Sequence, residues 1–149
     1  MPTTSVSLFA DWYSRNRERT RALFDLVSDD AYYDRPIDLR HPIVFYEGHL
    51  PAFSFNTLVK RALGGASIDP ALERLFARGI DPSDDSNLRP TPNATDHGAW
   101  PDRAVVRQFV AEADRRVWDA LVSCELDRPG DPLLHRSDRA RLVRARSAR

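Results

Sequence analysis

Hydrophobic residues recur at helical spacing in the first part of the chain. In residues 5–28, an apolar residue stands at almost every third or fourth position outside a polar middle section, residues 15–21. Such spacing predicts one long amphipathic helix, with Ser5 or Ser7 as a plausible N-cap. We expect its larger apolar side chains to form one broad buried face: Leu8, Phe9, Trp12, Leu23, Phe24 and Val27.

A second helix is predicted from about Ile43 to Leu63, after an extended connection over residues 29–42. Gly64-Gly65 should end this helix, because glycine readily adopts the left-handed conformation of a C-cap. Pro51 removes one backbone donor from the helix, so we expect a kink just after His49. Within and after this run, Phe45, Phe53 and Phe55 are expected in the core.

Two further helices and a long loop complete the predicted fold. Asp69 as N-cap and Pro70 as first residue predict a short helix that ends near Arg78-Gly79. Residues 80–101 contain four prolines and many small polar residues, so they read as a surface loop. A last amphipathic helix follows to about Val122, with Trp118 on its apolar face. The expected fold class is therefore all-α.

The end of the chain has a different composition. Residues 135–149 hold six arginines and one acidic residue, with few apolar side chains. We expect a helical domain over residues 1–134 and a basic, disordered tail over residues 135–149. A nucleic-acid-binding arm is the less favoured alternative, because no aromatic residues interleave with the arginines.

Composition narrows the class of protein further. The chain has 149 residues, a formal net charge of zero and a single cysteine, Cys124. These values fit one domain without an internal disulfide, and give no overall attraction to nucleic acid or membranes. No signal peptide or transmembrane stretch is read, so we expect a cytoplasmic protein.

His49 is the main candidate for chemistry, because it lies in the predominantly apolar run 43–53. An imidazole in such surroundings either binds a metal or hydrogen-bonds a neighbour such as Tyr46 or a carboxylate. Glu47 could accept a hydrogen bond from an imidazole, but residues two apart on a helix point apart. A solvated Glu47 is the favoured interpretation. His41 and His97 lie in predicted loops that give no argument for ligation.

Four segments together resemble a known family, namely residues 36–53 with Gly48-His49-Leu50, residues 56–59, residues 76–82, and Trp100-Pro101. They resemble the N-terminal DinB-like domain of the iron-dependent sulfoxide synthases of ergothioneine biosynthesis, and most closely the selenoneine branch. The resemblance implies an up-down bundle in which three histidines bind Fe(II). It also implies O2, a thiol or selenol, and a trimethylated histidine as reactants. His49 matches the first ligand of the family.

The other two ligands that the resemblance implies, in a His-Glu-x-x-x-His pattern, are missing. After Leu134 the chain continues with the arginine-rich residues from His135 onwards. We therefore expect a truncation or frame change, no complete fourth bundle helix, and no stoichiometric iron. A replacement site built from His49, His97 and His135 is not the favoured interpretation.

Two functions remain open at this point. The chain is either the domain of a C–S or C–Se bond-forming enzyme, inactive as this fragment, or a metal-free DinB-like binding module. A missing fourth helix would leave an apolar groove exposed, so self-association is expected as well.

Overall fold

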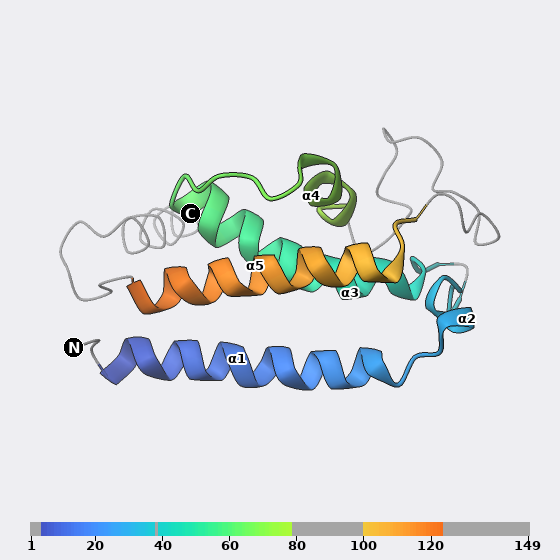
Figure 1. Cartoon of the computed structure of the whole chain (residues 1–149), viewed down its shortest axis with the longest axis horizontal. Helices are drawn as coiled ribbons and strands as arrows, with labels where there is room; N and C mark the ends of the chain where they lie inside the picture. Colours follow the sequence, from blue (N-terminus) through green and yellow to red (C-terminus); the bar gives the residue numbers. More distant parts are fainter. Residues whose placement is uncertain (1–3, 38, 79–99, 124–149) are drawn as a thin grey trace, which may run out of the picture.

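The computed structural model describes residues 4–37, 39–78 and 100–123, and this part of the chain is all-α (Figure 1). No strand occurs among these residues, so the predicted fold class is confirmed. The helical elements are α1 (Thr4–Asp25), α2 (Asp29–Tyr32), α3 (Ile43–Ser54), the π-helix η1 (Phe55–Ala62), α4 (Pro70–Phe76) and α5 (Arg103–Ser123).

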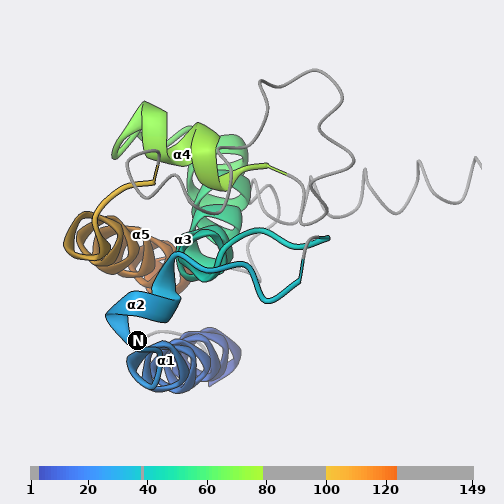
Figure 2. The same cartoon turned by 90° about the vertical axis from the view of Figure 1, so that its right-hand side faces the viewer.

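Three long helical segments run side by side, and α5 contacts both others (Figures 1 and 2). η1 continues α3, and both pack on α5, while α1 packs on a different face of α5 (Figure 2). The short α4 packs on α3. Within the described residues, no helix is both long and apolar enough to cross a membrane.

The connection after α1 contains a helical turn that the sequence pattern did not predict. α1 ends at Asp25, and α2 then begins after Ser28, whose hydroxyl accepts a hydrogen bond from the Ala31 N–H at 3.4 Å. Asp29 and Asp30 occupy the first turn of α2, where negative charge favours the positive end of the helix dipole. The prediction that they begin an extended loop is therefore wrong.

The second predicted helix is confirmed over nearly its whole length, and it contains an irregularity that the sequence pattern did not predict. α3 continues past His49 and through Pro51 to Ser54. The hydrogen-bond pattern widens only from Phe55, as in the bond from the Leu63 N–H to the Leu58 carbonyl. Gly64 then takes a positive φ of 70°, the left-handed conformation expected of a glycine after a helix end.

An aromatic core fills the space between α3, α4 and α5. We use this name for four buried side chains that pack together, Phe45, Phe76, Trp100 and Phe109. Gly48 lets the Phe76 ring approach α3 closely, because a Cβ at this position would overlap the ring. Asp69 positions α4 as predicted, by accepting hydrogen bonds from the first backbone N–H groups of the helix.

The predicted apolar face of α1 is not buried, and this corrects the sequence interpretation. Leu8, Trp12 and Leu23 are 59%, 59% and 61% exposed. The side of α1 that packs on α5 instead includes the buried Ala10 and Arg17. Arg17 can be buried there because it forms an ion pair with α5, which offsets the cost of removing its charge from water.

The aromatic residues expected in the core divide into two groups. Phe45 and Phe55 are fully buried, as predicted. Phe53 and Trp118 are 63% and 42% exposed, so the prediction that they belong to the core is wrong, as it is for Trp12. The loop after residue 80, Cys124, the tail and the missing fourth helix all concern residues outside those that the structure describes, and they stay predictions.

Candidate functional site

His49 lies on α3 and contacts the end of α4. Its Nδ1 is 2.8 Å from the carbonyl oxygen of Phe76, the last residue of α4. Because a carbonyl oxygen can only accept, Nδ1 carries the proton in this contact. In the neutral imidazole, Nε2 then keeps its lone pair and can bind a metal or accept a hydrogen bond.

Two phenylalanines on α3 lie beside the His49 ring. Phe45, one turn earlier on α3, stacks on it with ring centroids 4.9 Å apart and an interplanar angle of 25°. Phe53, one turn later, lies 6.4 Å away and is itself exposed. The half-buried imidazole therefore has one side against the core. The hydrogen-bond partner of His49 is a backbone carbonyl. The non-metal interpretation expected Tyr46 or a carboxylate in that place.

The local sequence explains why α4 ends beside His49. The last carbonyls of a helix lack partners within the helix, so they accept from outside. Gly48 lets the Phe76 ring sit directly against α3, which brings the Phe76 carbonyl to the neighbouring residue, His49. Gly48 and His49 thus both contact Phe76 and together hold the end of α4 against α3.

Glu47 faces α5 rather than solvent, which corrects the favoured interpretation of this residue. It is only 4% exposed, and its Oε1 accepts a hydrogen bond from Nε of Arg107 at 3.3 Å. Arg107 also donates to Asp25 on α1 at 2.6 Å. Although burial would lower it, the pKa of Arg107 is raised because Glu47 and Asp25 stabilise the charged guanidinium. Glu47 is thus an ion-pair partner between helices.

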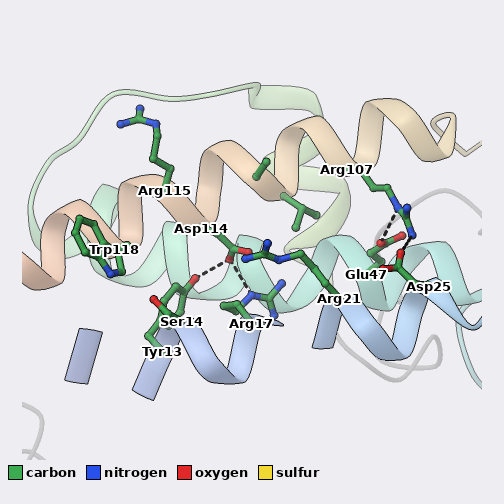
Figure 3. A pocket seen from close by; sticks show the side chains of 12 residues that line it. Tyr13, Ser14, Arg17, Arg21, Asp25, Glu47, Arg107, Asp114, Arg115 and Trp118 are labelled. Carbon is green, nitrogen blue, oxygen red and sulfur yellow. Dashed lines mark hydrogen bonds and ion pairs between the residues drawn. The ribbon is translucent and has the colours of Figure 1, made fainter. Parts of the chain in front are cut away.

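A second polar cluster joins α1 to α5 about two helical turns along α5 from Arg107 (Figure 3). Asp114 Oδ1 accepts hydrogen bonds from Tyr13 Oη and Arg17 Nε, both at 2.8 Å. Burial and the adjacent Asp114 carboxylate raise the pKa of Tyr13 above its ordinary value, so its phenol stays protonated and donates. Sequence reasoning missed this cluster, although Tyr13, Arg17 and Arg21 stand four residues apart on α1.

His41 does not join His49 in a common site. It is fully buried, and its ring centroid lies 4.1 Å from that of Phe45. His41 lies just before α3 begins at Ile43, whereas His49 lies within the helix, so the two imidazoles reach the Phe45 ring from different segments. His97 and His135 lie outside the described residues.

The chemistry of His49 fits a metal ligand, but it supplies one donor. Ligating histidines usually donate their second ring N–H to a carbonyl or carboxylate, as Nδ1 of His49 does. An Fe(II) site of the non-haem type needs about three such donors. Across residues 4–37, 39–78 and 100–123, no three His, Cys, Asp or Glu side chains are placed to share a metal ion.

Comparison with known proteins relates this chain to one superfamily and to two ergothioneine biosynthesis proteins. A family model described as the DinB superfamily matches residues 13–148. "Ergothioneine biosynthesis protein 1" of Schizosaccharomyces pombe is 26% identical over 114 residues, which cover 76% of this chain and 15% of the relative. The protein of the same name from Neurospora crassa is 31% identical over 94 residues, which cover 55% of this chain and 11% of the relative.

The chain thus spans less than a sixth of the length of these relatives. The similarity to them is distant, whereas the family match covers most of the chain. The helical fold of the described residues agrees with this match. The chain therefore belongs to the DinB superfamily.

Proposed function

We propose that this chain is the DinB-like domain of a non-haem iron enzyme of the ergothioneine or selenoneine type, with His49 as one metal ligand. The observation that carries the proposal is the contact of His49 Nδ1 with the Phe76 carbonyl, which leaves Nε2 to bind a metal. The distant similarity to two ergothioneine biosynthesis proteins supports the same class of enzyme.

The residues around His49 would hold the ligand rather than react. Phe45 restricts the ring from one side, and the Phe76 carbonyl fixes its tautomer. Such preorganisation reduces the entropy that the histidine loses when it binds a metal. A bound Fe(II) supplies the O2 chemistry that joins a thiol or selenol to a trimethylated histidine. The other ligands and the substrate contacts would come from other parts of the enzyme.

One donor cannot hold iron tightly, so we expect this chain alone to bind metal weakly and to catalyse no C–S or C–Se bond formation. The test is an anaerobic titration with Co(II), an Fe(II) substitute, followed by NMR of the histidine rings. Weak binding should shift the His49 ring signals first, and His49→Gln should abolish the effect while leaving the His41 signals unchanged.

Two results would contradict parts of this proposal. If Co(II) leaves the His49 ring unaffected at concentrations that bind free imidazole, His49 is not a ligand. Tight one-to-one Fe(II) binding that is lost in His49→Ala would instead overturn the expectation of a single donor, and would indicate a complete site in this chain.

The alternative is a metal-free DinB-like interaction module. The exposed apolar side chains on α1 and α3, Leu8, Trp12 and Phe53, favour it, because such residues often contact partners. The same titration discriminates between the two functions, since a metal-free module gives no metal-dependent signal from His49. Its histidine would then serve only to hold the end of α4.

A further inference from the structure

A groove of about 390 Å³ runs between η1 and α4, and most of its polar lining is basic. From η1 it is lined by Asn56, Lys60 and Arg61, and from α4 by Glu73 and Arg74. The hydrogen bonds of a π-helix join residues five apart, so residues 56, 60 and 61 come to lie on one side of η1. The irregular helix thus brings two cations and an amide to the same groove as Arg74.

The carboxylate in this lining, Glu73, is already compensated within the protein. Its side chain is 3% exposed. Its Oε1 accepts hydrogen bonds from the Ser67 hydroxyl and from the backbone N–H groups of Ile68 and Asp69. Its Oε2 accepts a hydrogen bond from Lys60. Four donors therefore hold the Glu73 charge, and the groove offers its remaining cations to a ligand.

These cations keep donors that the fold does not use. Arg61 and Arg74 are exposed, and neither forms an ion pair or a hydrogen bond with any residue that the structure describes. The Lys60 ammonium has three N–H groups and donates one of them to Glu73, and its side chain is 36% exposed. A single unpaired arginine is ordinary on a protein surface, but two that line one groove with a lysine repel each other. An anion bound among them removes that repulsion.

A phosphate group is the anion that suits these donors best. On an ester it carries about 1.5 to 2 negative charges at neutral pH and three strong acceptor oxygens. The planar fork of a guanidinium donates to two such oxygens at once, and an ammonium binds the group as a point charge. A carboxylate has one charge and two oxygens, so it compensates fewer of the cations.

The lining also indicates the size of the ligand. Single-stranded nucleic acids bind along basic grooves with aromatic side chains for the bases, and the described lining of this groove contains no aromatic residue. We propose that the groove binds the phosphate group of a small molecule, or free phosphate, with Arg61, Arg74 and the Lys60 ammonium as donors.

The experiment uses Lys60 as its reporter, because it is the only lysine of the chain. Incorporation of 13C-labelled lysine gives the NMR signals of this one side chain. Inorganic phosphate, added to the full chain at constant ionic strength, should shift these signals saturably, with a Kd on the order of 1 mM. Acetate should bind at least about fivefold more weakly, because it has fewer charges and acceptors.

Methyl phosphate in the same titration distinguishes the two sources of the phosphate group. A site for phosphate esters binds methyl phosphate as well as inorganic phosphate, whereas a site for the free ion binds it more weakly. Both results support the proposal, and each assigns one source.

Three variants with the same loss of charge show whether the groove itself binds. Arg61→Gln and Arg74→Gln should each weaken phosphate binding by about tenfold, because each loses charge-assisted hydrogen bonds. Arg19→Gln is the matched control, since Arg19 is an exposed arginine of α1 outside this groove, and it should leave the Kd unchanged. The amide spectra of the variants show whether the fold is retained.

Four results would overturn the proposal. The first is the absence of a saturable Lys60 shift with phosphate, and the second is equal binding of acetate. The third is an unchanged Kd in both Arg61→Gln and Arg74→Gln, as expected if phosphate binds only the arginines of residues 135–149. The fourth is a Lys60 shift with an oligothymidylate of about ten nucleotides but not with phosphate, which would assign the groove to nucleic acid.

This proposal does not depend on the metal function of His49, because His49 does not line the groove. Failure of the Co(II) titration would therefore leave the phosphate site standing, and failure of the phosphate titration would leave the metal ligand standing.

Discussion

α5 packs in two different ways, against α3 and α4 on one face and against α1 on another, and the contrast explains most of the fold. Toward α3 and α4 it presents apolar side chains such as Val106 and Phe109, which are 0% and 3% exposed. Toward α1 it presents Asp114, which forms an ion pair with the buried Arg17. The first contact is mainly apolar, with the Glu47–Arg107 ion pair beside it, and the second contains a buried ion pair.

The two contacts should also fail differently. Loss of an apolar side chain costs its transfer free energy and leaves a cavity whose size depends on how far the neighbours relax. Loss of one member of a buried ion pair leaves the other charge without a partner, whereas replacing both members by apolar residues is often neutral. Single and double substitutions therefore distinguish the two kinds of contact.

The largest effect is expected in the aromatic core. Phe76→Ala should lower the free energy of unfolding by about 3–5 kcal/mol, because Phe76 is fully buried against α3 and Phe109. Urea unfolding followed by circular dichroism measures the change. Phe53→Ala is the matched control, and since Phe53 is 63% exposed it should change stability by less than about 0.5 kcal/mol.

The next effect tests the polar contact between α1 and α5. Arg17→Met should cost about 3 kcal/mol, because it leaves the buried Asp114 carboxylate with only the Tyr13 hydroxyl as donor. Adding Asp114→Leu should restore most of the lost stability. If the double variant in the same urea assay is as unstable as Arg17→Met, the ion pair is not what controls this contact.

The sequence predicted the apolar contact well and the polar one not at all. Periodicity identified three long helices, and the Asp69 cap and the Gly64 turn were found where single residues have strong local preferences. The same periodicity misplaced α1, because it assigns apolar residues to the core. It gives no weight to a buried arginine whose partner, Asp114, lies 97 positions away.

Gly48→Ala tests how tightly the aromatic core is fitted. The added methyl group would overlap the Phe76 ring, so we expect a loss of about 1–3 kcal/mol from overpacking. In the Phe76→Ala background, the same substitution should cost much less, since the ring it collides with is gone. Equal costs in both backgrounds would show that the Gly48 contact does not limit the packing.

The candidate site shows a similar division between what the sequence could and could not predict. The apolar run around His49 indicated that this histidine is the main candidate for chemistry. The family resemblance implied that it is a metal ligand. The Phe76 carbonyl as its partner could not be predicted, because the contact joins two helices 27 residues apart through a backbone atom. Backbone acceptors carry no signature in the sequence.

A smaller, pH-dependent effect is expected at Glu73, which accepts from Lys60, Ser67 and the Ile68 N–H. Burial alone would raise the pKa of Glu73, but these hydrogen bonds lower it below the ordinary value of 4.5. The stabilisation is therefore present above pH 4.5 and is lost as the pH falls below it. We expect a loss of about 1 kcal/mol on acidification that Glu73→Gln does not show.

Glu112→Gln is the control for that comparison. Hydrogen bonds from Arg115 and Arg116 lower the pKa of Glu112 to about 2, but its side chain is 32% exposed. Solvent screens such a pair, so this variant should keep most of the acid sensitivity of the parent protein. Stability curves measured from pH 3 to pH 7 would show equal slopes for both variants if Glu73 had no special role.

The smallest effect on stability is expected on the exposed apolar side of α1. Leu23→Ser should change the free energy of unfolding by less than about 0.5 kcal/mol, because Leu23 is 61% exposed. Phe24→Ser, one residue further, removes a half-buried side chain and should cost more stability.

Sedimentation velocity tests whether this surface mediates self-association. Leu23→Ser should weaken self-association if the exposed leucines and Trp12 mediate it. A large loss of stability in Leu23→Ser would mean that α1 is held by its apolar residues after all, and that the ion pairs with α5 are secondary.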